Sequence, residues 1–270
     1  MLVNATNGGI RAQSLRYPVA MPFLELSAYS MKQTDAISFT ANQAALARAV
    51  QPGIGIYGEK RFGMAALNAS SVAVAMPTNM GNFGLQLNYA GFKNFNENKI
   101  GLAYARNLGP KLDIGVQFNY YGYHIPSYSN ASTVNFEAGA ILHFTSRFNG
   151  GIHIYNPVGG KLGKEREEKI AAVYKMALGY DASENFFVSC EMIKEENKPV
   201  NLVAGIQYQF AGQFILRTGF TTASSTFFAG AGVGWKNMRL YVSGSYHQQL
   251  GISPAVLLLA NFGSRKNKQE

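Results

Sequence analysis

The sequence predicts an all-β fold, an antiparallel up-and-down β-barrel of about 14 strands that spans a membrane and carries a short N-terminal helical hatch. Composition is the first indication. Only 14% of the 270 residues are charged, against roughly a quarter in soluble domains, and Gly (29), Tyr (15) and Phe (18) are abundant. The second indication is a long series of runs in which apolar and polar residues alternate, and the third is a regular alternation of short and long connections between those runs.

Residues 1–23 are expected to be a leader or the remnant of a signal peptide. The apolar start, Met1 to Val3, is followed by a polar run, so it is shorter than the roughly 7 to 15 apolar residues of a secretory signal. We expect the biological start to lie upstream, with cleavage near Ala12 or Gln13. A disordered cytoplasmic leader is the alternative.

Residues 24–52 differ from everything that follows and are expected to form a hatch segment. A helix is predicted over 43–50, with Thr40 or Asn42 as its N-cap and Pro52 as its stop. The segment is too short to be a domain of its own.

Residues 53–263 are expected to form the transmembrane barrel. Most of the runs are about 8 to 12 residues long, close to the roughly 9 to 11 that a tilted strand needs to cross a bilayer, whereas soluble strands usually have about 5 or 6. No stretch reaches the roughly 18 apolar residues of a transmembrane helix. The predicted strands are 53–61, 69–76, 82–91, 99–106, 111–121, 133–144, 150–156, 169–180, 185–194, 200–210, 213–221, 226–235, 238–247 and 253–262.

The connections between these strands differ in length at the two ends of the barrel. Every second connection is tight and rich in turn formers: PTNMG, NLGP, TSRFN, DASEN, AGQ and KNM. The intervening ones include FKNFNEN, GYHIPSYSNAS and PVGGKLGKEREE. An outer-membrane barrel with both termini in the periplasm has this asymmetry, so residues 264–270 are expected to be a basic periplasmic tail.

The two faces of each strand differ in polarity. The apolar set, such as Leu112, Ile114 and Val116, is expected to face lipid, and aromatic residues near strand ends are expected to form interfacial girdles: Phe92, Tyr104, Tyr180, Phe220 and Tyr246. The opposite set is expected to face the lumen, where charges can pair and meet water, and supplies the candidate ligand or lumen residues: Asp113, Glu137, His143, Lys175, Glu191, Gln207, Arg217, Arg239 and His247.

One alternative to a lipid-facing apolar set remains open. The apolar set could be the core of a soluble sandwich, which also needs one apolar face per strand.

On the barrel interpretation, Arg217 is expected to pair with Glu191 or Glu137 and to tie the wall to the hatch. The glycines between Gly230 and Gly234 are expected to let a neighbouring backbone or the hatch approach closely.

Catalytic and metal-binding motifs are absent from the sequence. Cys190 is the only cysteine, none of the four histidines has the spacing of an HExxH motif, and there is no GxSxG elbow. His143 and His247 could meet Ser243, Ser245 or Glu137 in the lumen, but an interior histidine is far commoner than a catalytic triad. The sequence therefore predicts a protein that is not an enzyme and has no metal site and no cofactor.

The net charge of +9 indicates anionic partners. The basic residues are scattered over turns and strand ends, so lipid head groups explain the charge better than nucleic acid does. The most charged loop is expected either to contact lipopolysaccharide or an external partner, through Lys161, Lys164 and Arg166, or simply to be solvated.

Three stretches together resemble FadL-type and PorV-type outer-membrane barrels. Residues 26–30 (LSAYS), 34–39 (TDAISF) and 42–47 (NQAALA) look like the "GGAY…DA…NPAALA" opening of these proteins, although Gln43 replaces the usual proline. The hairpin over 205–220 is similar to their "GLEY…LALRAGY" element, and residues 250–262 resemble their last strand. The resemblance covers nearly the whole chain, and the order of the motifs is what makes it specific. The family includes the PorV/PorQ-like proteins of Bacteroidetes that are associated with type IX secretion, and the short outer loops favour these over FadL-like transporters.

The resemblance implies a fourteen-stranded outer-membrane barrel with the N-terminal segment in or under the lumen. It assigns the hatch positions Tyr29, Asp35, Phe39, Asn42 and Leu46. The leading expectation is a non-enzymatic PorV-like accessory subunit that binds another envelope or secretion protein. The alternatives are a FadL-like transporter of hydrophobic small molecules and, from a different class, a soluble β-rich binding protein.

Overall fold

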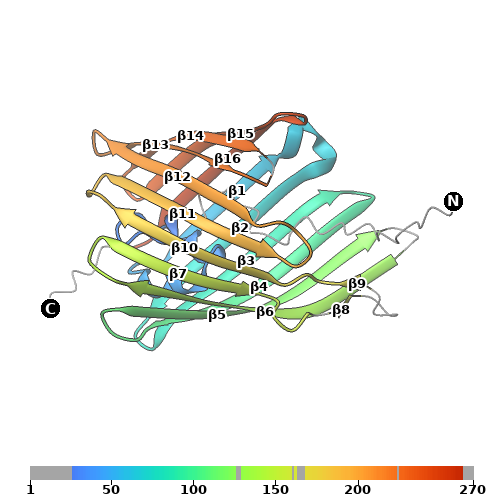
Figure 1. The fold of residues 1–270 in the computed structure, drawn as a ribbon, viewed down its shortest axis with the longest axis horizontal. Coiled ribbons are helices and arrows are strands. Elements are labelled where there is room, and N and C mark those ends of the chain that lie inside the picture. The colour runs from blue at the N-terminus through green and yellow to red at the C-terminus, as the bar shows by residue number, and fades with distance from the viewer. Residues whose placement is uncertain (1–25, 126–128, 160, 163–167, 224, 264–270) are drawn as a thin grey trace.

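A computed structural model describes residues 26–125, 129–159, 161–162, 168–223 and 225–263 (Figure 1). The predicted leader (1–23) and basic tail (264–270) lie outside the described residues. Fourteen antiparallel strands form one closed barrel, in which each strand pairs with its neighbours in sequence and β1 pairs with β16. Closure leaves no free sheet edge, so the backbone groups of every strand are paired within the wall.

The strands of the barrel have 8 to 15 residues, around or above the roughly 9 to 11 that a tilted strand needs to cross a bilayer. Their bounds are β1 (Gly53–Lys60), β2 (Asn68–Thr78), β3 (Gly81–Phe92), β4 (Phe95–Asn107), β5 (Leu112–Ile125), β6 (Ser129–His143), β7 (Phe148–Tyr155), β10 (Val173–Asp181), β11 (Phe186–Glu195), β12 (Asn201–Phe210), β13 (Phe214–Thr221), β14 (Thr226–Trp235), β15 (Met238–His247) and β16 (Gly251–Asn261). A separate two-stranded piece, β8 (Lys161–Leu162) with β9 (Glu168–Lys169), lies in the connection between β7 and β10.

The predicted fold class and strand number are confirmed, and the largest differences in strand bounds are four residues, at one end of β4, β5, β6 and β10; β10 begins at Val173 and not at 169. The stretch FKNFNEN was expected to be a loop, but β3 and β4 continue through it and pair up to Phe92 with Phe95. In the same way β5 runs on to Ile125 and β6 begins at Ser129. Where a barrel strand extends beyond the part of the wall that faces lipid, it needs no apolar face. The end of hydrophobic alternation in the sequence therefore does not mark the end of the strand.

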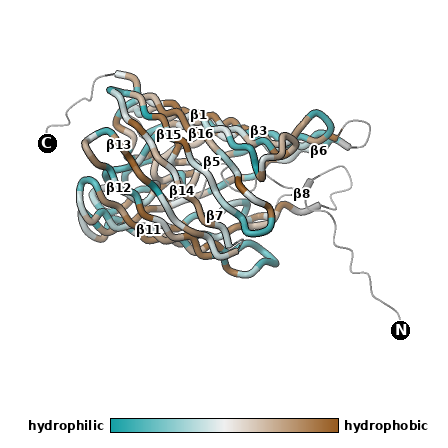
Figure 2. The backbone as a smooth tube through the Cα atoms, turned by 90° about the horizontal axis from the view of Figure 1, so that it is seen from above, coloured by the Kyte–Doolittle hydropathy of each residue, from teal (hydrophilic) through white to brown (hydrophobic). Residues whose placement is uncertain are grey.

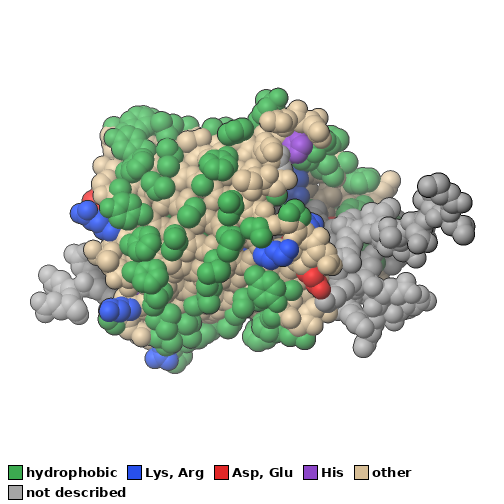
Figure 3. Space-filling model, viewed as in Figure 1, with side chains coloured by type: hydrophobic (Ala, Val, Ile, Leu, Met, Phe, Trp, Pro, Cys, Tyr) green, Lys and Arg blue, Asp and Glu red, His purple; other side chains and the backbone are tan. Residues whose placement is uncertain are grey.

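Large apolar side chains cover the outside of the barrel. Phe118, Val134 and Val242 are 64%, 66% and 58% exposed, whereas the alternate positions Asp113, Gln117 and Glu137 are at most 2% exposed. Figure 2 shows the alternation of hydropathy along the strands, and in Figure 3 hydrophobic side chains spread across the wall while charged ones lie toward its two ends. A soluble sandwich would bury the apolar set, so that alternative is wrong and the surface is the one that a bilayer requires.

The connections at the two ends of the barrel differ in length less than predicted, because β3 and β4 are joined by only two residues and β5 and β6 by three, where longer loops were expected. We call the end with the tight turns, at 79–80, 108–111, 144–147, 182–185, 211–213 and 236–237, the turn end, and the opposite end the loop end. The short helices η3 (Arg61–Gly63) and η4 (Ala65–Leu67) lie at the loop end. No helix among the described residues is long and apolar enough to cross a membrane.

The hatch, residues 26–51, lies inside the barrel near the turn end, where Figure 1 draws it in blue. It contains η1 (Ser38–Thr40) and η2 (Gln43–Arg48), both 3₁₀ helices. The helix predicted over 43–50 therefore exists but is tighter and shorter than expected. Asn42 is its N-cap, with the side-chain oxygen accepting from the Ala44 N–H at 3.0 Å.

Inward-facing glycines let the hatch lie directly against the wall. A Cβ at Gly115 would lie 2.4 Å from the carbonyl carbon of Gln43, and one at Gly179 would lie 2.4 Å from the carbonyl oxygen of Tyr29. Further wall glycines would meet hatch atoms at 3.0 Å or less: Gly53, Gly55, Gly84, Gly139, Gly151 and Gly205. Only glycine permits this approach of a backbone to the sheet.

The glycines between Gly230 and Gly234 have a different role from the one expected for the hatch. A Cβ at Gly232 would lie 2.3 Å from the ring of Tyr241, and one at Gly230 would lie 2.7 Å from the Cβ of Ser243. These glycines make room for side chains of the neighbouring strand β15.

Candidate functional site

The interior of the barrel centres on the carboxylate of Glu137 on β6. Lys99 Nζ of β4 lies 2.8 Å from Glu137 Oε1, and His153 Nε2 of β7 lies 3.1 Å from Oε2. From the hatch, Gln43 Nε2 donates to Oε2 at 2.7 Å, and Asn119 Nδ2 of β5 donates to Oε1 at 2.8 Å. Glu137 therefore joins three wall strands to the hatch through charge-assisted hydrogen bonds shielded from solvent.

A second interior ion pair lies on β10 and β11. Lys175 Nζ is 3.7 Å from Glu191 Oε2, and the Tyr29 hydroxyl of the hatch donates to Glu191 Oε1 at 2.9 Å. Both charged side chains are at most 1% exposed. Their burial, with that of Tyr29, closes the lumen to solvent at this point of the hatch.

Asp113 holds the C-terminal end of the hatch. Arg48 Nε of η2 lies 2.6 Å from Asp113 Oδ2, and His143 Nε2 of β6 lies 2.7 Å from the same atom. His143 Nδ1 in turn lies 2.6 Å from Asn149 Oδ1, and Asn149 Nδ2 donates to the Tyr29 carbonyl at 3.1 Å. One chain of hydrogen bonds thus connects both halves of the hatch to the wall.

Asp35 of the hatch is clamped by two arginines, and we call these three residues the Asp35 latch. Arg217 Nη2 of β13 lies 3.3 Å from Asp35 Oδ2, and Arg239 Nη1 of β15 lies 2.8 Å from Oδ1. The guanidinium of Arg217 also stacks over the Tyr241 ring at 4.3 Å. The latch fixes the middle of the hatch against the side of the barrel formed by β13 to β15.

The structure brings together most of the residues predicted for the lumen, but it changes two of their partners. Arg217 ties the wall to the hatch as expected, yet it does so through Asp35 and not through Glu191 or Glu137. His143 contacts Asp113 and Asn149, and none of the serines considered with it. The partners depend on the path of the hatch, which alternation along a strand does not specify.

His247 does not belong to the interior cluster. It ends β15 at the loop end, packs edge-on against Phe62 with the ring centres 5.9 Å apart, and its Nδ1 accepts from the backbone N–H of Gln249 at 3.2 Å. The proposed meeting of His247 with interior partners is therefore wrong. Lys164 and Arg166 of the charged loop lie outside the described residues, and Lys161 belongs to β8.

The hatch positions assigned by resemblance all lie against the wall. Tyr29, Phe39, Asn42 and Leu46 are at most 2% exposed. Asn42 Nδ2 donates to the Ile152 carbonyl at 3.0 Å, the Leu46 carbonyl accepts from Asn82 Nδ2 at 2.7 Å, and the Phe39 ring lies over Gly84. Their roles in function stay a prediction.

Several interior residues were not predicted. Lys99 and His153 share the inward face of their strands with small or polar residues, so strand parity alone would have found them. The Ser30 hydroxyl and the Met31 backbone N–H donate to the Asp181 carboxylate at 2.5 and 2.9 Å, and Arg48 binds Asp113. These contacts have no signal in the sequence because they depend on where the hatch lies.

An apolar trough of about 620 Å³ lies on the outer face of β12 to β15, directly over the Asp35 latch. Its rims are large side chains and its middle is made of small ones on β14 and β15; it is lined by Ile206, Tyr208, Leu216, Arg217, Thr218, Ala229, Gly230, Ala231, Val242, Ser243 and Gly244. The β13–β14 and β14–β15 ladders are continuous beneath it, so the trough is a groove and not an opening.

Within the described residues, no group of three or more His, Cys, Asp or Glu side chains could hold a metal ion. Cys190 is exposed on the outer face of β11. The polar contacts between hatch and wall in the interior are hydrogen bonds and ion pairs.

No family model matches the chain, and no curated protein matches it. Solved structures do match. The TodX monoaromatic hydrocarbon channel, as a deletion mutant, aligns with a TM-score of 0.63 at 10% identity over 87% of this chain and 98% of the other. The fold is that of the FadL-like channels.

Two further structures have the same fold. The CymD monoaromatic hydrocarbon channel aligns with a TM-score of 0.62 at 10% identity, over 85% of this chain and 94% of the other. A Pseudomonas aeruginosa FadL homologue aligns with a TM-score of 0.60 at 12% identity, over 87% of this chain and 95% of the other. The FadL half of the predicted resemblance is confirmed at the level of fold.

Proposed function

We propose that the protein is an outer-membrane channel for small hydrophobic molecules, opened by movement of the hatch, with the turn end in the periplasm. The observation that carries the proposal is the Asp35 latch, which fixes the hatch to the wall directly beneath an apolar trough on the membrane side. The monoaromatic hydrocarbon channels TodX and CymD, which share the fold, favour this substrate class.

The interior at the level of the hatch gives an apolar molecule no path while the hatch stays in place. Lys99, Glu137, Lys175 and Glu191 are at most 2% exposed and bind one another or the hatch. An apolar molecule there would separate buried charges from their partners without replacing the contacts. Passage therefore requires the hatch to shift.

The trough suits a small apolar molecule that moves between the barrel and the membrane. Its volume of about 620 Å³ falls within the roughly 300 to 1,000 Å³ of typical ligand pockets. Arg217 lies at the floor of the trough, and its side chain points from there to the inside of the barrel, where it holds the hatch, so only the thickness of the sheet separates the trough from the latch.

Filling the trough tests the proposal. With Ala231→Trp, toluene uptake by cells that depend on this barrel is expected to fall to about a tenth of the wild-type rate, the ratio that corresponds to about 1.4 kcal/mol. Ala138→Trp, on the outer face of β6 and far from the trough, is the matched control and should leave uptake unchanged. Wild-type uptake by an Ala231→Trp barrel that folds normally would remove the trough from the route.

A partner-binding role in secretion is the second candidate. It is favoured by the burial of the lumen, because a barrel that its hatch keeps closed can dock a partner without transporting a molecule. A stoichiometric protein recovered with the barrel from gently solubilised membranes, together with no barrel-dependent toluene uptake, would favour this role over the channel.

A further inference from the structure

A polar hollow lies on the outside of the barrel at the loop end, where β4, β5 and β6 extend farther than the other strands. These strands have 13, 14 and 15 residues, and their outward positions change there from apolar to polar. Ile100, Tyr120 and Val134 pair in one row across the three strands. The next outward-facing row, two residues farther toward the loop end, is Asn98, Gly122 and Ser132. The hollow thus lies at the boundary between the apolar belt and water.

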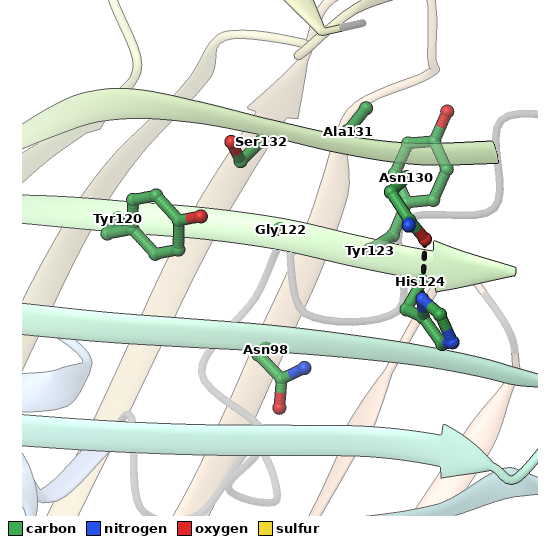
Figure 4. Close-up of a pocket in the computed structure, with 8 residues that line it drawn as sticks. All are labelled: Asn98, Tyr120, Gly122, Tyr123, His124, Asn130, Ala131 and Ser132. Carbon is green, nitrogen blue, oxygen red and sulfur yellow. Dashed lines mark hydrogen bonds between the residues drawn. The ribbon is translucent and has the colours of Figure 1, made fainter.

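Gly122 forms the floor of this hollow, which has a volume of about 270 Å³. A Cβ placed on Gly122 would meet no atom nearer than 3.5 Å, so the glycine leaves real space. Figure 4 shows Tyr120 on one side of Gly122 along its strand and the His124–Asn130 pair on the other, with Ser132 and Asn98 on the neighbouring strands. His124 Nδ1 and Asn130 Oδ1 are 2.5 Å apart.

The chemistry of the walls indicates that the part of the ligand inside the hollow is uncharged and polyhydroxylated. Two amides, a hydroxyl and an imidazole offer both donors and acceptors, as sugar hydroxyls require, and the Tyr120 ring offers an apolar face for the C–H side of a sugar ring. None of the eight lining residues is Lys, Arg, Asp or Glu, so the hollow itself fits sugar hydroxyls, and any phosphate or carboxylate of the ligand lies outside it. Asn98 Nδ2 donates to Asn96 Oδ1 and Asn130 Oδ1 pairs with His124, so a purely apolar ligand would cover the remaining amide groups, Asn98 Oδ1 and Asn130 Nδ2, without giving them a partner.

A second hollow next to the first indicates that the ligand is a lipid. Asn98 separates the polar hollow from one of about 400 Å³, which Val72, Leu87 and Ile100 help to line. A molecule with a sugar head and an apolar tail fills both hollows at once. We propose that β4 to β6 bind the sugar head group of a glycolipid of the outer leaflet, a site that is separate from the channel and its hatch.

The test measures binding to detergent-solubilised barrel by native mass spectrometry with three probes: rough lipopolysaccharide, its lipid A part without core sugars, and the released core oligosaccharide. Gly122→Leu fills the hollow without strain, and its affinity for lipopolysaccharide is expected to be about tenfold lower than that of the wild type. Gly58→Leu, also outward-facing, with no atom within 4 Å of its added Cβ, is the matched control and should bind as the wild type does.

The probes distinguish the sources of the sugar. Strong binding of lipopolysaccharide, weak binding of lipid A and loss in Gly122→Leu support the glycolipid. Equal binding of the free oligosaccharide and lipopolysaccharide would overturn the lipid part of the proposal in favour of a soluble sugar. Equal affinity of wild type, Gly122→Leu and Asn98→Ala for all three probes would overturn the site, and Asn98→Ala serves alone if the leucine variant does not fold.

Discussion

Glu137→Ala is expected to lower the free energy of unfolding of the barrel by about 3 to 5 kcal/mol, because it leaves the Lys99 ammonium buried without its carboxylate partner. The substitution also removes the acceptor of Gln43 Nε2, so the hatch loses a contact at the same time. The measurement is the fraction of folded barrel on unheated gels across a urea series in detergent micelles.

Removal of both charges is the control for that result. In Glu137→Leu combined with Lys99→Met, neither charge remains buried, and the free energy of unfolding is expected to recover part of the loss. A loss below about 1 kcal/mol in Glu137→Ala would mean that the pair is solvated, contrary to its burial.

Gly115→Val is expected to push the hatch out of its seat and to open the lumen. Its Cβ would lie 2.4 Å from the carbonyl carbon of Gln43 and 2.6 Å from the backbone nitrogen of Ala44, so the hatch backbone must move. Overpacking of this kind costs about 1 to 3 kcal/mol of stability. We expect the hatch to move and the wall to stay in place, because β5 is paired with both β4 and β6 in continuous ladders.

The consequence of Gly115→Val is measured as ion conductance in planar bilayers and as cleavage of the hatch by added protease. Both are expected to rise well above the wild-type level, since the lumen left behind is lined by charged and amide side chains. Gly58→Val, where an added Cβ meets nothing within 4 Å, should behave as the wild type. A Gly115→Val barrel that stays closed and resistant to protease would show that the hatch has room to yield.

The wall of the barrel could be predicted from the sequence because lipid imposes a strict rule on it. Every second residue must be apolar across the bilayer. The faces of the strands therefore follow from the alternation, and the number of strands follows from the alternation together with the positions of the turns. Where β4 to β6 leave the bilayer the rule no longer applies, and Asn96, Asn98 and Asn130 were assigned to loops although they lie on strands.

The candidate site was predicted in part for the same reason. Parity placed Asp113, Glu137, Lys175 and Glu191 inside the barrel, where each is buried. Parity does not say which of them the hatch meets, because the hatch has no regular period. Thus the sequence assigned Asp35 to the hatch and Arg217 to the wall, but only the structure shows that the two side chains bind each other.

The most direct test of hatch movement is toluene uptake by a barrel whose hatch is locked to the wall. An added Cβ on Gly53 of β1 would lie 2.9 Å from the Cβ of Ala36, next to the latch residue Asp35, so Ala36→Cys with Gly53→Cys is expected to form a disulfide after a small shift. The lone cysteine is removed by Cys190→Ala. Uptake is expected to stop in the oxidised barrel and to return on reduction; uptake at the wild-type rate by the fully oxidised barrel would contradict a channel that opens by movement of its hatch.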